Sequence, residues 1–184
     1  MKIRSVMQNN IKQLRILHYG YEDISLDAKS GPRVRNTCII HYVLSGRGYY
    51  NQVPLQAGQG FVIDAGELVE YHYDETEPWT YFWVIITGDL SKEICHNHIS
   101  VNAHKIFSYD FSNKLLQMIP GIFSSSATIP QTEALSLFFY LLSLHEIRPR
   151  DNGNHYVSDA KNYMQLHIYQ PITISEVASV LGIS

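Results

Sequence analysis

Short apolar runs separated by glycine-containing turn clusters mark the first half of the chain, from Ile3 to about Gly88. The runs are rich in Val, Ile, Tyr and Trp and cover residues 38–44, 60–63, 68–73 and 79–87. The turn clusters lie at residues 45–48, 57–60, 64–67 and 74–78. Short strands at regular spacing with such turns predict a β-sandwich or a barrel. The periodicity alone leaves open an unspecified antiparallel sheet with helices packed on it.

The pattern becomes helical after Asp89. Four apolar residues at the spacing of one helix face predict a helix that ends at Pro120-Gly121: Phe111, Leu115, Leu116 and Ile119. A longer segment, residues 131–147, is apolar around most of its circumference, whereas a surface helix needs only one apolar stripe. We therefore expect this helix to pack on two sides. One side should cover the β-domain, and the other should either form a homodimer seam or be buried within the chain.

The polar stretch at residues 148–155 has the composition of a linker, and two short helical patterns follow it. The second pattern opens with a predicted capping box, in which Thr173 caps a backbone N–H and Glu176 reaches back. It continues through Ala178 to Gly182, a spacing typical of two closely crossing helices with a left-handed glycine between them. Fewer than 30 residues follow the linker, too few to bury a stable core, so we expect a truncated domain.

Composition narrows the class of protein. Hydrophobic residues make up 45% and charged residues 17% of the 184 residues, which excludes an intrinsically disordered chain. A formal net charge of −3 argues against a protein that coats nucleic acid by bulk charge. No apolar run is long enough to span a bilayer, and the N-terminus lacks the core of a signal peptide. Cys38 and Cys95 form no close pairing motif, which indicates a reducing compartment, so a cytoplasmic protein without membrane contact is expected.

The tail closely resembles the opening of the DNA-binding domain of AraC-type transcription regulators, in the strings at residues 157–164, 172–178 and 181–184. The strings at residues 42–48, 55–63 and 77–84 look like the effector-binding barrel of the same family, and residues 39–42 with 78–88 are most similar to its sugar-utilisation members of the multiple-sugar-metabolism type. The resemblance implies a mainly β protein with helices. It places a cupin-like double-stranded β-helix (jelly-roll) barrel at residues 1–88, an α-helical dimerisation segment at 89–147, a linker at 148–155 and the start of a helix-turn-helix domain at 156–184.

The resemblance also implies a function. The protein would be a homodimeric regulator of a carbohydrate-utilisation operon whose effector is a mono- or oligosaccharide. Five residues carry over as the part of the helix-turn-helix that is present: Thr173, Glu176, Ala178, Gly182 and Ser184. Ser184 would be the N-cap of the recognition helix. Because that helix reads base edges, we expect the full-length protein to bind operator DNA and this chain not to bind it.

The alternative function is that of a stand-alone cupin enzyme acting on a sugar or small metabolite. Catalytic cupins bind a metal through side chains at fixed positions, so the residues at those positions in this sequence test the alternative. Those positions fall near Arg33, Arg35, Ile39 and Val69, which cannot hold a dication. Residues 95–98, Cys-His-Asn-His, lack the two tight ligand pairs of structural zinc and are better explained as a polar helix end. We therefore expect no metal, no cofactor and no catalysis.

Alternation of side chains along the strands identifies a candidate ligand site in the barrel lumen. If Ile39 faces inward, Arg33, Arg35 and His41 share its face, as do Tyr71 and, on the last strand, Tyr81 and Trp83. Aromatic rings stack on the apolar side of a sugar while guanidinium and phenol groups fix its hydroxyls, so this set suits a neutral polyol. The resemblance places Trp83 beneath the sugar, with Tyr71 and an arginine around it. The same residues also fit a purely structural role in half-buried strands.

Overall fold

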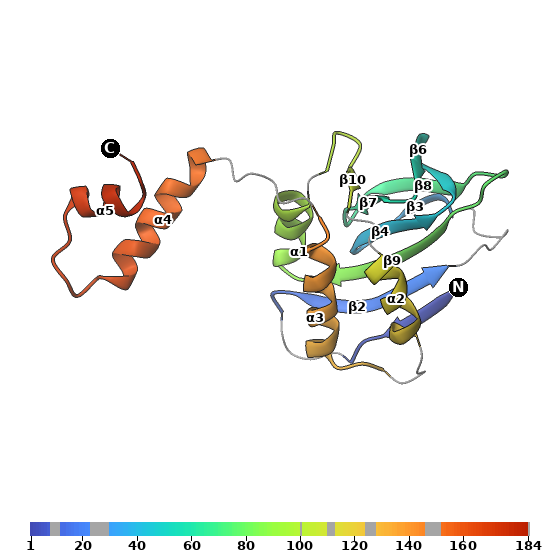
Figure 1. Ribbon diagram of the computed structural model, residues 1–184, viewed down its shortest axis with the longest axis horizontal. Coiled ribbons are helices and arrows are strands. Elements are labelled where there is room, and N and C mark those ends of the chain that lie inside the picture. The colour runs from blue at the N-terminus through green and yellow to red at the C-terminus, as the bar shows by residue number, and fades with distance from the viewer. Residues whose placement is uncertain are drawn as a thin grey trace. The chain divides into compact units, whose positions relative to one another are not determined.

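A computed structural model describes residues 1–7, 12–22, 30–99, 101–109, 113–123, 128–145 and 152–183 (Figure 1). The chain divides into two units, Met1–Arg148 and Pro149–Ser184. The first holds all the described strands and the second holds two helices.

Two antiparallel sheets build the first unit. The larger has six strands in the order β1-β2-β9-β4-β7-β10, and the smaller has four in the order β3-β8-β5-β6. The strands are β1 (Lys2–Ser5), β2 (Arg15–Glu22), β3 (Ser30–Val34), β4 (Cys38–Ser45), β5 (Arg47–Tyr50), β6 (Val53–Gln56), β7 (Gln59–Ile63), β8 (Leu68–Tyr73), β9 (Thr80–Thr87) and β10 (Ile106–Ser108). This arrangement confirms the predicted mainly β, cupin-like fold.

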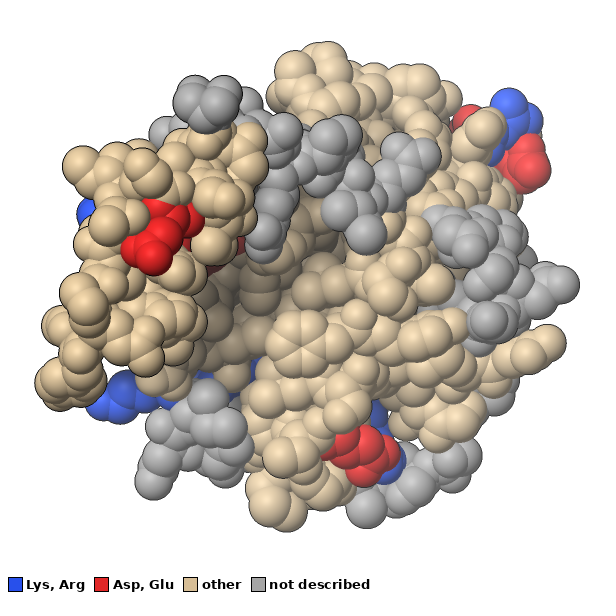
Figure 2. Space-filling model, turned by 60° about the vertical axis from the view of Figure 1, so that its left-hand side comes forward, with Lys and Arg blue, Asp and Glu red and all other residues tan. Residues whose placement is uncertain are grey.

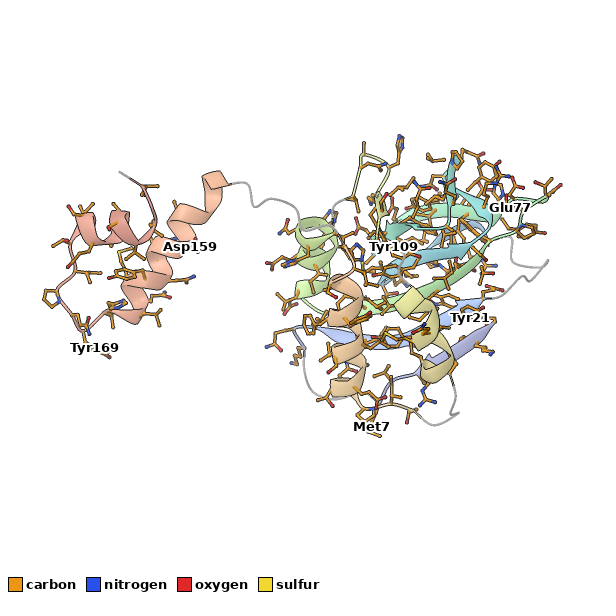
Figure 3. The ribbon with its side chains drawn as sticks, in the orientation of Figure 1. Met7, Tyr21, Glu77, Tyr109, Asp159 and Tyr169 are labelled. Carbon is orange, nitrogen blue, oxygen red and sulfur yellow. The ribbon has the colours of Figure 1, made fainter. Side chains whose placement is uncertain are left out.

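Two buried clusters lie on opposite faces of the six-stranded sheet. The inner cluster fills the space between the two sheets and consists of Ile39, Val43, Tyr50, Leu55, Phe61, Ile63, Val69, Tyr71, Trp79, Tyr81, Trp83 and Ile106. The outer cluster lies under the helices and takes the alternate residues of the same strands, such as Ile40 and Tyr42 of β4. Side chains fill both spaces (Figure 3). Because β4 and β9 are covered on both faces, their sequences read as nearly continuous apolar runs.

Helices cover the outer face of the six-stranded sheet. They are α1 (Leu90–Glu93), which continues as the π-helical turn η1 (Ile94–His98), then α2 (Asn113–Ile122) and α3 (Gln131–Leu142). Helix α3 crosses β2 (Figure 1) and buries Ala134, Phe138 and Leu141 against the sheet. The hydroxyl of Tyr19 on β2 donates to the carbonyl oxygen of Ala134 (2.6 Å), which fixes the helix to the strand.

Helix α2 differs from its predicted end. The sequence predicts a stop at Pro120-Gly121, but the helix runs through both residues to Ile122. Pro120 has no N–H to donate, so the last turn lacks one helical hydrogen bond, and the helix ends two residues later. The next turn is closed by the amide of Phe123, which donates to the carbonyl oxygen of Ile119 (3.3 Å).

The second unit contains α4 (Asn152–Leu166) and α5 (Ile174–Val180). Helix α4 begins within the stretch predicted as linker, of which residues 148–151 lie outside the described residues. Tyr169, 99% exposed, lies in the connection between the two helices (Figure 3). None of the helices in the described part of the chain combines the length and the apolar character needed to cross a bilayer.

Candidate ligand site in the barrel

His41 lies at the centre of an aromatic chamber formed by part of the inner cluster. Its ring centroid is 4.4 Å from that of Phe61, 5.1 Å from Tyr71, 5.5 Å from Tyr81 and 6.2 Å from Trp83. Strands β4, β7, β8 and β9 therefore all contribute to the chamber. Of its five ring residues, all but Phe61 are among those that strand alternation assigns to the inner face. The side-chain alternation of the strands places these rings together although they are far apart in the sequence.

The imidazole of His41 is neutral at physiological pH. Its side chain is buried, and burial, with the nearby positive charge of Arg35, lowers its pKa from 6.5 to about 3. The buried Nδ1 atom has no hydrogen-bond partner among the described residues. A buried polar atom without a partner is costly unless a ligand or water satisfies it. His41 is therefore available as a neutral hydrogen-bonding group inside the chamber.

Arg35 approaches the chamber from the connection between β3 and β4. Its Nη2 atom donates to the hydroxyl of Tyr71 at 3.3 Å, and its side chain is half-buried. The Nε atom is buried and, within the described part of the chain, also lacks a partner. The Arg35 guanidinium therefore keeps N–H groups that can donate to the hydroxyl groups of a ligand.

Tyr81 and Glu22 form a buried polar pair that sequence reasoning missed. The two residues are opposite each other on β9 and β2, and the Tyr81 hydroxyl donates to Oε2 of Glu22 at 2.7 Å. Glu22 is only 8% exposed. Burial raises the pKa of Tyr81 well above its ordinary value, so the phenol remains a donor. The carboxylate adds an acceptor to a chamber whose other polar groups are mainly donors.

Arg33 does not share the position of the other candidates. Alternation predicts that it faces inward, and its Cα partner on β8 is the buried Val69, but the Arg33 side chain is exposed. The pairing of β3 with β8 shifts register between Ser30 and Arg33. Arg33 is thus paired with a residue of the inner cluster while its own side chain reaches solvent, and its contact with a ligand remains a prediction.

Among the described residues, no group of three or more His, Cys, Asp or Glu side chains is placed to hold a metal ion. In the Cys-His-Asn-His segment, Cys95 is buried whereas His96 and His98 are exposed. His96 lies 3.2 Å from a carboxylate oxygen of Asp64. The segment is thus the end of a short helical turn with one side in the core and one at the surface.

The predicted capping box is present in the second unit. Thr173 Oγ1 accepts from the amide of Glu176 (3.2 Å), and a carboxylate oxygen of Glu176 accepts from the amide of Thr173 (2.7 Å). Gly182 has a φ of 65°, the left-handed conformation that favours glycine. Ala178 is half-buried beside an apolar hollow of about 350 Å³ between α4 and α5, and Ser184 lies outside the described residues.

His145, a buried histidine on the outer face of the sheet, should make the free energy of unfolding depend on pH. His145 follows α3, and its Nε2 atom lies 2.9 Å from the hydroxyl of Tyr42. Burial lowers its pKa from 6.5 to about 4, so between these values the unfolded chain holds a proton that the folded chain lacks. We expect the free energy of unfolding to fall as the pH drops from 6.5 toward 4, by up to about 1.4 kcal/mol per pH unit from this residue.

Urea denaturation of the wild type and of His145→Gln at several pH values measures this effect. The variant retains a polar group near Tyr42 but does not titrate, so its stability should depend less steeply on pH in this window. Equal slopes for the two proteins would contradict the assignment.

Two sheets enclose a cluster of aromatic rings with a few hydrogen-bonding groups, a composition typical of small-molecule sites. Residues 16–143 match the family described as the AraC-like ligand binding domain, and the chain belongs to this family. It is 25% identical over 191 residues to the Msm operon regulatory protein of Streptococcus mutans, covering 93% of this chain and 67% of that protein. It is 27% identical over 161 residues to the lactose operon transcription activator of Staphylococcus xylosus, covering 79% of this chain and 58% of that one.

The chain thus spans about two thirds or less of the length of these relatives. Among solved structures it is similar to ToxT from Vibrio cholerae, with a TM-score of 0.38 and 10% identity over 100% of this chain and 70% of ToxT.

Proposed function

We propose that this chain is the effector-binding and dimerisation part of an AraC-type transcription regulator that controls a carbohydrate-utilisation operon. The observation that carries the proposal is the chamber of stacked rings around His41, joined by one guanidinium and one carboxylate. Membership of the ligand-binding family supports an effector role for the barrel, and the sugar-operon relatives support a saccharide as the effector.

The chemistry of the chamber favours a neutral polyol. Its rings offer flat apolar surfaces, which suit the C–H face of a pyranose. The charged groups around them, Arg35 and Glu22, are of opposite sign, and His41 is neutral. An anionic ligand would meet the buried carboxylate, whereas hydroxyl groups can donate to Glu22 and accept from Arg35.

Binding is proposed to act by population shift, because an effector that prefers one arrangement of the regulator changes how two DNA-binding units reach their half-sites. Residues 156–184 would be the first part of the DNA-binding unit. The face shown in Figure 2 carries few described charged side chains, and they form no patch of one sign.

We further propose a homodimer through α3. The side of this helix that faces away from β2 presents Phe139, which is 56% exposed, with the half-buried Leu135 and Leu142 four residues before and three residues after it. Residues at this spacing share one helix face. An exposed phenylalanine flanked by leucines is typical of a helix–helix interface.

A thermal-shift screen tests the effector. We expect the melting temperature to rise with at least one neutral saccharide among glucose, galactose, lactose and raffinose, because a ligand at one hundred times its dissociation constant adds about 2.7 kcal/mol of stability. Glucose 6-phosphate is the charged control and should shift the melting temperature less than glucose does.

Two results would overturn this assignment. One is stabilisation by phosphorylated sugars alone. The other is a purified protein that contains a stoichiometric transition metal and turns over a sugar, which would establish the catalytic alternative.

A further inference from the structure

Gly20 of β2 lies directly against the indole of Trp83. The two residues are Cα partners in the pairing of β2 with β9. A Cβ atom placed on Gly20 would overlap Cζ2, Cε2 and Cη2 of the indole ring. The ring therefore occupies the volume that any other residue at position 20 would need for its own side chain.

The backbone at Gly20 does not itself call for glycine. The glycines with a positive φ are Gly46, Gly58, Gly66, Gly88 and Gly182 among the described residues, so Gly20 has a strand conformation that other residues adopt. In a strand interior a glycine lowers stability, because it has no side chain to pack and more conformational freedom to lose. The close approach of the indole is the structural reason for glycine at this position.

The second tryptophan of the inner cluster is placed in the same way. A Cβ atom on Gly48 of β5 would overlap the ring of Trp79. Gly48 also lies outside the set of positive φ values. Each tryptophan is thus packed against a glycine, and each ring lies close to a strand backbone. Gly20 belongs to the six-stranded sheet and Gly48 to the four-stranded sheet.

We propose that Gly20 is a positioning residue for ligand binding, because it lets the indole of Trp83 lie against β2 and so fixes the ring that a saccharide would contact. This inference rests on the proposed function and deepens it. Trp83 keeps 8% of its surface exposed, whereas neighbours such as Phe61 and Ile63 keep 1% and 0%. A side chain at position 20 would push the indole away from β2 and toward His41, whose ring centroid is 6.2 Å from that of Trp83.

The ligand class follows from the position of the ring. An indole held against a strand presents a fixed flat surface, which suits the C–H face of a pyranose better than a branched or charged group. The buried pair of Glu22 and Tyr81 is adjacent, because residues 20 and 22 of β2 are opposite Trp83 and Tyr81 of β9. A pyranose stacked on Trp83 would have its hydroxyls near this pair.

The test is Gly20→Ala, with Gly121→Ala as the matched control, because a Cβ atom on Gly121 of α2 meets nothing within 4 Å. Titration with glucose, galactose, lactose and raffinose should show at least a tenfold weaker affinity for Gly20→Ala with the saccharide that binds the wild type, and no change for Gly121→Ala. Tryptophan fluorescence should shift in Gly20→Ala without ligand, and that shift should vanish when Trp83 is replaced by phenylalanine.

A double-variant cycle separates this inference from the proposed function. In a Trp83→Phe background, adding Gly20→Ala should change affinity less than twofold, because the smaller ring leaves room for the methyl group. A folded Gly20→Ala with wild-type affinity and fluorescence would overturn the positioning role. If Gly20→Ala does not fold, Trp83→Phe should restore folding, and failure to do so also overturns it. If Trp83→Ala itself leaves saccharide binding unchanged, the proposed ligand site is what fails.

Discussion

Replacing Trp83 by alanine is expected to weaken saccharide binding by about 2 kcal/mol or more, the scale for removing a buried aromatic anchor. The indole lies in the chamber beside His41 and Tyr81, at centroid distances of 6.2 Å and 5.5 Å. Its removal deletes the flat apolar surface while the polar groups remain. Isothermal titration with the saccharide that stabilises the wild type, together with the melting temperature of the ligand-free protein, measures both effects.

The adjacent residue is the control for this experiment. Phe82 is fully buried, but it belongs to the outer cluster on the opposite face of β9. Phe82→Ala should cost about 3–5 kcal/mol of stability and leave the affinity of the folded fraction unchanged. If Trp83→Ala behaves like Phe82→Ala, with a lower melting temperature and wild-type affinity, Trp83 is a core residue and not a ligand contact.

A second pair of neighbours tests the two sides of α3. Phe138 is 0% exposed in the outer cluster, and Phe139 is 56% exposed. We expect Phe138→Ala to lower the free energy of unfolding by about 3–5 kcal/mol, because it leaves a cavity under the helix. Phe139→Ala should stay within about 0.5 kcal/mol of the wild type in dilute solution, where monomers dominate.

Self-association, unlike stability, should depend on Phe139 rather than on Phe138. Sedimentation at tens of micromolar is expected to show a wild-type dimer that Phe139→Asp converts to monomer, because a charge at the seam would be buried without a partner. A wild-type monomer at this concentration, or a dimer that Phe139→Asp leaves unchanged, would refute the proposed interface.

Local patterns were sufficient to predict much of the fold. Alternation on β4 correctly separates Ile39 and Val43, which lie in the inner cluster, from Ile40 and Tyr42, which lie in the outer one. The capping box at Thr173 was predictable because both of its bonds join residues three positions apart. In each case the physical cause lies within a few residues of sequence.

Features that depend on distant partners were not predicted. Glu22 is placed in the site by its bond to Tyr81, 59 residues away, and nothing local in the sequence shows which strand lies beside β2. The same holds for Gly20, whose meaning appears only with Trp83 across the pairing. Alternation predicts which face Arg33 shares, but not that its side chain is exposed although its partner Val69 is buried. Ligand binding remains a prediction for all six candidates: Arg33, Arg35, His41, Tyr71, Tyr81 and Trp83.

The covering of β4 on both faces has a consequence for hydrogen–deuterium exchange. This strand pairs with β7 on one side and β9 on the other, and every residue from Cys38 to Leu44 is buried. Its amides can meet solvent only when the whole sheet opens, so their exchange reports global unfolding. An effector that binds only the folded state slows that exchange by the factor 1 + [L]/Kd. Deuterium uptake in the peptide containing residues 38–44 therefore measures effector occupancy directly, without a dye or a label in the chamber.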